Sequence, residues 1–237
     1  MLGSRLALAK KYLIGMSAIF PKWTNRLPGL LIIAFLLISS GVVAGFWYYF
    51  TPKYTRVGYQ PIQPVSFSHA LHVGQVGLDC RYCHNGEDKS WYSNIPTAST
   101  CMNCHVQVLK DDPRLALVRE SASSGLPIHW IQIHRLPDFV FFNHAVHVNR
   151  GISCVECHGQ VNQMDEVYHA KSLTMAFCLE CHRHPDKALR PLDKVTDLNW
   201  KWNEDLRIAA EKQRVNGKKF AREWRVQSLQ TCSACHR

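Results

Sequence analysis

The hydrophobic residues are most concentrated near the start of the chain, in one uninterrupted apolar run. It reads PGLLIIAFLLISSGVVAGFWYYF, from Pro28 to Phe50, and contains no charged side chain. A helix needs about 20 mostly apolar residues to cross a bilayer. A cleaved signal peptide has a shorter apolar region, of about 7–15 residues. The pattern therefore predicts an uncleaved signal anchor that spans the membrane once, over residues 27–50.

The residues before this run predict its orientation. They include five Lys and Arg and no acidic residue, and basic residues favour the cytoplasmic side of a membrane. We therefore place the N-terminus in the cytoplasm and the bulk of the chain on the periplasmic, outer face of the cell inner membrane. Residues 1–26 mix apolar and basic side chains, which is typical of an amphipathic segment. Such a segment lies on the inner membrane surface or packs against the helices of a partner.

Beyond the apolar run the pattern changes. Residues 51–66 contain three prolines, which predicts an extended linker. From residue 67 onward few stretches alternate apolar and polar positions, so we expect little β-structure. A helix is expected within NEDLRIAAEKQRVNG, with Asn203 as its N-cap and Gly217 as its stop.

One seven-residue phrase occurs twice in the part of the chain that follows the linker. FSHALHV begins at Phe67 and FNHAVHV begins at Phe142, and a Cys-x-x-Cys-His motif follows each of them. Repetition on this scale indicates an internal duplication. We expect two similar units, over residues 67–105 and 142–182, within one domain over residues 67–237.

All ten cysteines fall in five Cys-x-x-Cys-His motifs. Two thiols three residues apart lie on one side of a helical turn, where both can bond the vinyl groups of one porphyrin, and the following His can face the iron. Disulfides would not require a His after every pair, and zinc sites use other spacings. The motifs therefore predict five covalently bound haem c groups. The attachment residues are Cys80, Cys83, Cys101, Cys104, Cys154, Cys157, Cys178, Cys181, Cys232 and Cys235, and the proximal ligands are His84, His105, His158, His182 and His236.

The length of the chain predicts its fold class. Roughly 187 residues follow the anchor, which is too few to bury five porphyrins and to build a separate hydrophobic core as well. We expect a multihaem cytochrome c fold, with short α-helices and irregular loops wrapped around five haems. Covalent haem is attached on the outer side of the energy-coupling membrane, which agrees with the predicted orientation.

The duplicated phrase supplies candidates for the distal iron ligands. The first copy holds His69 and His72, and the second holds His144 and His147. Residues three apart face the same way from one helical turn, so each pair can reach two neighbouring irons. The fifth distal ligand is predicted to be His134, with Met164, Met175, His129, His169 and His184 as alternatives. A Met ligand would raise the reduction potential of its haem.

The net charge and the predicted iron ligands limit the functions that this chain can have. The formal net charge is +10, from 28 basic and 18 acidic residues. No basic stripe with interleaved aromatic residues occurs, which argues against nucleic-acid binding. Arg and Lys are good partners for the haem propionates, which would offset much of the surplus. An iron with two protein ligands has no open position, so we expect electron transfer and no catalytic residue on this chain.

The paired phrase with its Cys-x-x-Cys-His motif resembles multihaem cytochromes of the class III and cytochrome c7 type. The resemblance implies that the first His of each pair serves the haem of the following motif. His69 would then ligate the haem on Cys80 and Cys83, and His144 would ligate the haem on Cys154 and Cys157. The second histidines, His72 and His147, would serve neighbouring haems.

A more specific resemblance rests on HRLPDFVFFNHAVHV, LTMAFCLECHRHP, the N-terminal anchor and the five motifs. Together they are similar to the pentahaem cytochrome c subunit of alternative complex III, a respiratory or photosynthetic quinol:electron-acceptor oxidoreductase of bacteria. This implies that quinol is oxidised at partner subunits. Those partners would be multi-spanning quinol-binding membrane subunits, an iron–sulfur subunit and a monohaem cytochrome c subunit. Electrons would leave to a downstream periplasmic carrier or oxidase. The alternative is a stand-alone, membrane-tethered multihaem quinol dehydrogenase.

Overall fold

The computed structural model describes residues 20–50 and 55–236, and the chain divides into two units, Met1–Thr51 and Pro52–Arg237. Two parts of the predicted segments lie outside the described residues: residues 1–19 of the amphipathic segment and residues 51–54 of the linker. We call the second unit the motif domain, because it holds all five Cys-x-x-Cys-His motifs.

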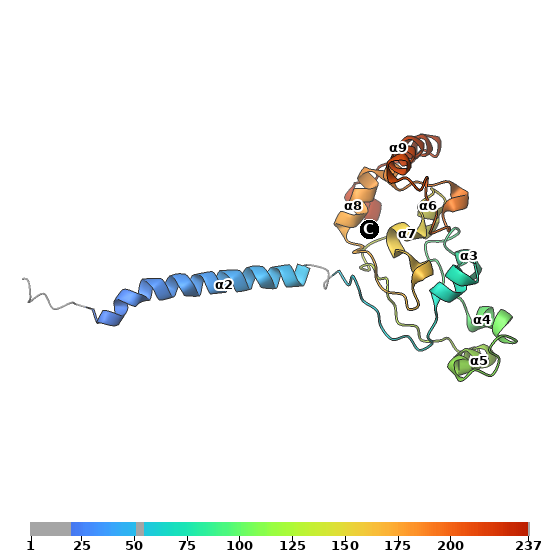
Figure 1. Cartoon of the computed structure of the whole chain (residues 1–237), viewed down its shortest axis with the longest axis horizontal. Helices are drawn as coiled ribbons and strands as arrows, with labels where there is room; N and C mark the ends of the chain where they lie inside the picture. Colours follow the sequence, from blue (N-terminus) through green and yellow to red (C-terminus); the bar gives the residue numbers. More distant parts are fainter. Residues whose placement is uncertain (1–19, 51–54, 237) are drawn as a thin grey trace, which may run out of the picture. The chain divides into compact units, whose positions relative to one another are not determined.

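The first unit consists of a short 3-10 helix, η1 (Lys22–Arg26), followed by the long helix α2 (Leu27–Phe50) (Figure 1). None of the residues of α2 is buried. The stretch Lys22–Phe50 is 29 residues long with a mean hydropathy of 2.4, so its length and composition allow it to cross a membrane. The predicted apolar helix is thus present as a candidate membrane anchor.

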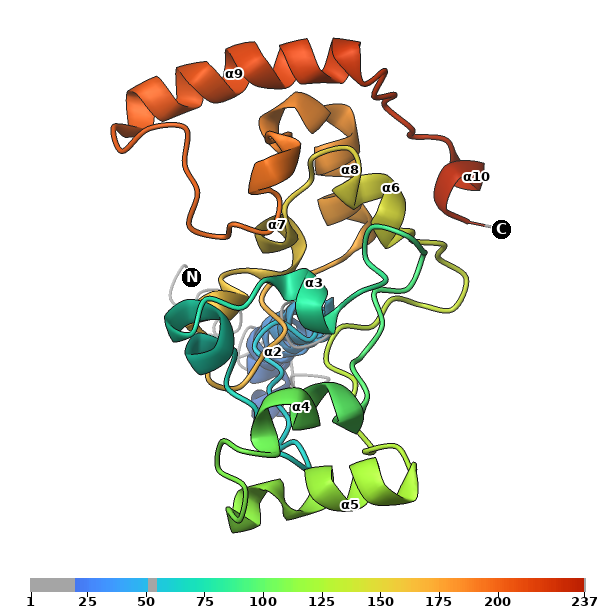
Figure 2. The same cartoon turned by 90° about the vertical axis from the view of Figure 1, so that its right-hand side faces the viewer.

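Short helices joined by irregular loops build the motif domain (Figure 2). In chain order they are η2 (Ala70–Gln75), α3 (Cys80–Cys83), α4 (Ala98–His105), η3 (Pro113–Leu115), α5 (Ala116–Ser124), α6 (His144–Val148), α7 (Cys154–His158), η4 (Val161–Gln163), α8 (Met175–Arg183), η5 (Pro185–Lys187), η6 (Leu192–Lys194), α9 (Leu206–Glu223) and α10 (Cys232–Cys235). Within residues 55–236 the β-structure is limited to isolated bridges, Val140 with His236 and Ile152 with Leu189. The prediction of short helices with little β-structure is confirmed.

The hydrophobic core of the motif domain is small. Its buried apolar residues are Val65, Ala98, Val118, Met164, Leu189, Val195 and Leu198. Val65, Ala98 and Val118 form one cluster, which holds α4 against α5. A domain of this length normally buries a larger apolar interior. This scarcity of aliphatic core supports the expectation that cofactors fill part of the interior.

The described part of the predicted linker contacts the motif domain directly. The backbone N–H of Gly58 donates to the carbonyl of His169 at 2.8 Å, and the His169 N–H donates to the carbonyl of Tyr59 at 3.0 Å. Further along, the Gln63 side chain donates to the Ile131 carbonyl at 2.8 Å and accepts from the Ile131 N–H at 2.9 Å. These residues therefore belong to the same compact unit as the motifs.

Helix α9 differs from its predicted bounds. Its N-cap is Asp205, which accepts from the N–H groups of Arg207 and Ile208, so the prediction of Asn203 as the cap is wrong. The helix also runs through Gly217 to Glu223, so the predicted stop at Gly217 is wrong. Gly217 is buried, and a Cβ there would overlap the backbone carbonyl of Asp186 in η5. This glycine permits close packing of two elements and does not end the helix.

Replacement of Gly217 by alanine tests this packing. The added methyl group must displace backbone in η5, so we expect the free energy of unfolding to fall by about 1–3 kcal/mol. Thermal unfolding of the haem-loaded protein measures the change. Lys218→Ala is the matched control, because Lys218 is exposed on the same turn and surface substitutions usually change stability by less than about 0.5 kcal/mol. Equal melting temperatures for the two variants would contradict the role assigned to Gly217.

Candidate haem-binding sites

Each Cys-x-x-Cys-His motif forms a short helical turn, in α3, α4, α7, α8 and α10. Two of these helices have a polar N-cap side chain. The Asp79 carboxylate accepts from the Arg81 N–H at 2.9 Å, and the Thr174 hydroxyl accepts from the Phe177 N–H at 3.4 Å. Because the two thiols of a motif are three residues apart on a helix, they lie on one side of the turn. All ten thiols are free, so disulfides do not compete for them.

Thiols of different motifs lie close enough to perturb one another, and this places the motifs in an order. Burial and the charges of Cys101 and Cys104 raise the pKa of Cys83, so the first motif neighbours the second. Interaction with Cys80 of the first motif, together with burial, raises the pKa of Cys154. The first motif therefore also neighbours the third.

The third motif continues the series toward the C-terminus. Burial raises the pKa of Cys157 to about 12, with added contributions from Cys181 and Cys178 of the fourth motif. Burial and the charge of Cys235 raise the pKa of Cys178, so the fourth motif neighbours the fifth. The spatial order is thus second, first, third, fourth, fifth, and Figure 2 shows its first four members as α4, α3, α7 and α8.

The two copies of the duplicated phrase have the same local geometry. Phe67 lies 4.8 Å from His69, edge to face, and 4.3 Å from His72, stacked. In the second copy Phe142 lies 4.8 Å from His144, edge to face, and 4.5 Å from His147, stacked. Each Phe therefore packs against both imidazoles of its pair.

Backbone carbonyls fix the tautomer of many of these histidines. Nδ1 of His72 bonds the Ser68 carbonyl and Nδ1 of His147 bonds the Asn143 carbonyl, both at 2.8 Å. A carbonyl can only accept, so each Nδ1 carries the proton and each Nε2 keeps a free lone pair. The same contact occurs at His84, His105, His144 and His236, with the carbonyls of Asn94, Val108, Trp91 and Phe139. This is the outer-shell arrangement that orients metal-ligating imidazoles.

Three pairs of imidazoles lie at the separation that two ligands of one iron require. The ring centroids are 6.2 Å apart for His72 and His105, 6.1 Å for His147 and His182, and 6.4 Å for His144 and His158. Metal–nitrogen bonds of about 2 Å, plus the half-width of each ring, give about 6 Å between centroids. The residues present therefore fit haem at these three motifs. Among residues 20–50 and 55–236, no group of three or more His, Cys, Asp or Glu could hold a metal ion by itself.

Among the described residues, no imidazole pairs with His236 of the fifth motif in the way that His72 pairs with His105. The ring of His134 lies 4.4 Å from His158 and 5.2 Å from His169, while the ring of His236 contacts Phe139 at 5.7 Å. The role of His134 as the fifth distal ligand stays a prediction. Of the alternatives, Met175 is 64% exposed, whereas His169 is 1% exposed and its Nδ1 has no hydrogen-bond partner.

The two units of the duplication contact each other reciprocally. The Ala70 N–H, in the first phrase, donates to the Met164 carbonyl at 2.9 Å, and the Ala145 N–H, in the second, donates to the Ser90 carbonyl at 3.0 Å. Ser90 and Met164 each lie ten residues after the first Cys of their unit. Each phrase is thus positioned by the loop that follows the other unit's first motif.

A buried carboxyl group was not foreseen from the sequence. Glu87 is 5% exposed and neither of its carboxyl oxygens has a hydrogen-bond partner. Burial raises its pKa, and its charge contributes to the raised pKa of Cys154. In the sequence, Glu87 stands in the polar stretch NGEDKS, which resembles an exposed loop, so no local signal marks it.

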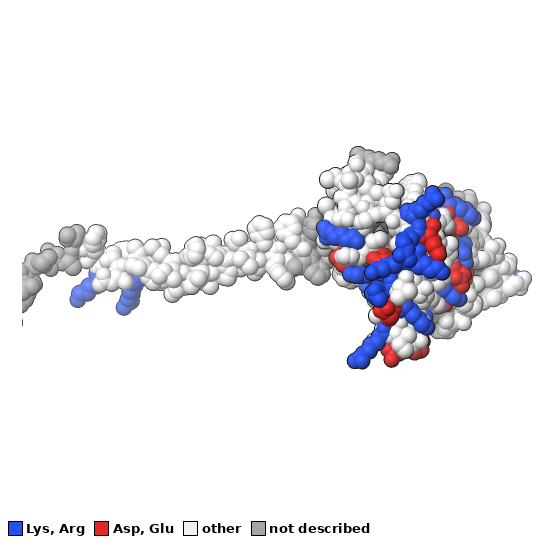
Figure 3. All heavy atoms as spheres, turned by 90° about the horizontal axis from the view of Figure 1, so that it is seen from above, with Lys and Arg blue, Asp and Glu red and all other residues white. Residues whose placement is uncertain are grey.

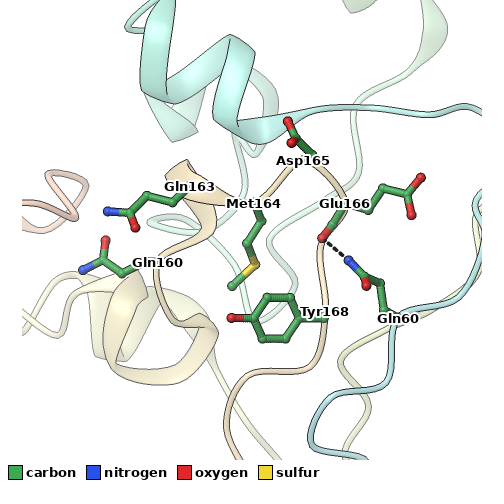
Figure 4. Close-up of a pocket in the computed structure, with 7 residues that line it drawn as sticks. All are labelled: Gln60, Gln160, Gln163, Met164, Asp165, Glu166 and Tyr168. Carbon is green, nitrogen blue, oxygen red and sulfur yellow. Dashed lines mark hydrogen bonds between the residues drawn. The ribbon is translucent and has the colours of Figure 1, made fainter.

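One polar pocket lies outside the motifs (Figure 4). It has a volume of about 310 Å³ and is lined by Gln60, Gln160, Gln163, Met164, Asp165, Glu166 and Tyr168. Gln60 donates to the Glu166 carbonyl at 2.7 Å. The lining offers amides and carboxylates but no Ser, Cys or Lys beside a base, so the pocket provides no nucleophile of the usual kind.

Three partly buried histidines predict a pH dependence of stability. Burial lowers the pKa of His69 and His134 to about 4 and of His158 to about 3. The unfolded chain takes up protons on these residues below about pH 6.5, while the folded chain keeps them neutral to about pH 4. The contribution of these histidines to the free energy of unfolding is therefore at its full value above pH 6.5 and decreases as the pH falls toward 4. Thermal melting between pH 8 and pH 4 measures this, and a constant melting temperature below pH 6.5 would contradict it.

Comparison with known proteins supports the haem interpretation. Residues 140–237 match the family model described as cytochrome c7 and related cytochrome c. The chain is also 34% identical over 125 residues to the "Menaquinone reductase, multiheme cytochrome c subunit" of Nitratidesulfovibrio vulgaris, strain Hildenborough. This match covers 52% of the chain and 57% of the relative, so the chain spans little more than half the length of that protein.

Proposed function

We propose that the chain is a membrane-anchored pentahaem c-type cytochrome that transfers electrons, and the match of residues 140–237 to the cytochrome c7 family model supports this. The observation that carries the proposal is the set of three imidazole pairs with ring centroids 6.1–6.4 Å apart, along a series of neighbouring motifs. Neighbouring redox sites in such a series suit electron transfer over a distance that no single cofactor spans.

The residues of this chain have distinct roles in the proposal. The cysteines of each motif bind the porphyrin, and the following His is the proximal ligand. When bound, haem supplies one-electron redox chemistry. His72, His144 and His147 are the distal ligands of the second, third and fourth haems, and His69 is that of the first. Phe67 and Phe142 hold the imidazoles of each pair in orientation, and two ligands per iron leave no position for a substrate.

We infer that quinone chemistry takes place on partner subunits. The relative named above is a subunit of a menaquinone reductase, and the sequence resemblance points to alternative complex III. The partners are then multi-spanning quinol-binding membrane subunits, an iron–sulfur subunit and a monohaem cytochrome c subunit. The anchor Lys22–Phe50 lies among them or in lipid, the N-terminus is cytoplasmic, and the haems deliver electrons to a periplasmic acceptor.

The name of the relative favours a second direction of electron flow. A menaquinone reductase delivers electrons to quinone, whereas the resemblance to alternative complex III implies quinol oxidation. A series of closed haems conducts in either direction, and the potentials of donor and acceptor decide which one occurs. The two candidate functions therefore share this chain's mechanism and differ in the partners.

Purification in mild detergent tests the proposal. We expect multi-spanning subunits and an iron–sulfur protein to remain bound, and the complex to oxidise quinol with an artificial acceptor. Faster reduction of menaquinone by a reduced artificial donor would favour the second direction. If the chain purifies alone and still oxidises quinol, the complex assignment is wrong and the stand-alone dehydrogenase holds. If it carries no covalent haem, the proposed function fails.

A further inference from the structure

The outer surface of α9 is strongly basic. Residues 206–225 include seven Lys and Arg and two Glu. Both Glu pair within the helix: Glu211 with Arg214 at 2.6 Å, and Glu223 with Lys219 at 3.8 Å. Figure 3 views the motif domain from the side on which α9 lies in Figure 1, and basic side chains gather there. The exposed basic residues of α9 that form no ion pair with any described residue are Arg207, Lys212, Lys218 and Arg222.

Helical geometry separates these charges from the buried side of α9. At 3.6 residues per turn, the outward-facing set lies within an arc of about 140°. We call this set the α9 basic face; it consists of Arg207, Lys212, Lys218, Lys219 and Arg222. The opposite side contacts the domain, where Gln213 donates to the carbonyls of Asp186 and Leu189 at 2.8 and 2.9 Å and Gly217 is buried. The basic residues are therefore not needed to hold the helix in place.

Two aliphatic side chains lie in the middle of the α9 basic face. Ile208 is 47% exposed and Val215 is 51% exposed, and they are two turns apart on the same side. A small apolar centre with a charged rim is typical of a protein–protein interface. A helix that binds a bilayer surface needs a wide apolar face, whereas the widest apolar part of α9, around Phe220, stacks on Trp224 and Trp202. The surface therefore fits a protein better than a membrane.

The position of α9 places this surface at one end of the motif series. The helix packs against η5, which directly follows the fourth motif in α8. The chain then leads from α9 to the fifth motif in α10. Residues 55–166, which include the first three motifs, hold eight Lys and Arg and ten Asp and Glu. Positive charge is thus concentrated beside the fourth and fifth motifs.

We propose that the α9 basic face docks an acidic redox protein, with carboxylates around a small apolar patch, that exchanges electrons with the fourth and fifth haems. The inference rests on the proposed electron-transfer function and adds the site and chemistry of the partner. Complementary charge steers such encounters and raises association rates by about 10- to 1,000-fold. Weak, short-lived electron-transfer complexes need only a small interface.

The test uses the full chain with its haems in nanodiscs and, as probe, a reduced acidic plant-type [2Fe–2S] ferredoxin. In each encounter the cluster loses one electron and one ferric haem becomes ferrous. The test variant is Lys212→Glu/Lys218→Glu/Arg222→Glu. The matched control is Lys89→Glu/Lys110→Glu/Arg150→Glu, which makes the same change of net charge at exposed residues away from α9. Stopped-flow absorbance gives the rate constant, and binding of oxidised ferredoxin to the immobilised protein gives a readout independent of electron transfer.

We expect the test variant to lower the association rate constant at least about tenfold at low salt, and the control to change it less than about twofold. The difference should shrink at about 0.5 M salt because charges are then screened. Equal effects of the two variants would overturn the inference while leaving the electron-transfer function intact. A chain whose haems accept no electrons even from dithionite would overturn the proposed function as well. Protection of Lys212 from an amine reagent only in anionic nanodiscs would overturn the inference in favour of membrane binding.

Discussion

Replacement of His147 by alanine is expected to convert about one haem in five from a low-spin to a high-spin, ligand-accessible state. The ring centroids of His147 and His182 are 6.1 Å apart, and Nδ1 of His147 bonds the Asn143 carbonyl. Removal of the imidazole leaves the iron of the fourth motif with its proximal ligand alone, so carbon monoxide should bind the reduced protein. Electron paramagnetic resonance and the visible spectrum of the carbon monoxide adduct measure both effects.

The control for this experiment is His129→Ala. His129 is exposed and has no ring contact with another described residue, so its removal should leave every haem low-spin. His147→Met should restore six coordination and raise the potential of one haem, since a Met ligand favours the reduced state. A fully low-spin His147→Ala protein would show that His147 is not an iron ligand.

Removal of the third attachment site is expected to interrupt electron transfer along the domain. The pKa of Cys154 is raised by Cys80 of the first motif, and that of Cys157 by Cys181 and Cys178 of the fourth, so the third motif joins the two halves of the series. In the Cys154→Ala/Cys157→Ala variant, the rate of electron equilibration between the two halves should fall at least about tenfold, a barrier increase of about 1.4 kcal/mol. Flash reduction followed by absorbance changes at separate haems measures this rate.

The matched control is Cys232→Ala/Cys235→Ala. It also removes one haem, which intact mass spectrometry verifies, but the fifth motif lies at the end of the series. The remaining four haems should therefore equilibrate at the unaltered rate. Circular dichroism and thermal melting establish that each variant is folded. Equal rates for the two double variants would contradict the order second, first, third, fourth, fifth.

Much of the fold could be predicted because its signals are local. The apolar run needs only its own composition to predict a membrane-length helix. Cys-x-x-Cys-His depends on the spacing within one helical turn, and the short helices around the motifs follow from it. The duplicated phrase was expected to present two imidazoles from one turn, and the matching geometry around Phe67 and Phe142 agrees with this.

Other features could not be predicted because they depend on contacts between residues far apart in the chain. Gly217 was expected to end a helix, but a glycine stands there because the backbone of η5 approaches too closely for a Cβ atom. In the folded chain Asp205, and not Asn203, is the N-cap of α9. Both residue types cap well, so the path of the chain decides which of them does so. Glu87 stands in a polar stretch of the sequence, and only the folded chain shows that it is buried.

By itself, the sequence determined the chemistry available to this protein: the number of attachment motifs, the paired histidines, the apolar helix and the basic character of residues 206–225. These depend on residue type and on spacings of a few residues, which helical geometry converts directly into side-chain positions. Only the tertiary structure decided which imidazoles face each other, that the motif order in space differs from the order in the chain, and that the positive charge of α9 faces outward. Those outcomes require loops from the two duplicated units to contact each other, and no short-range pattern encodes which of the possible contacts forms.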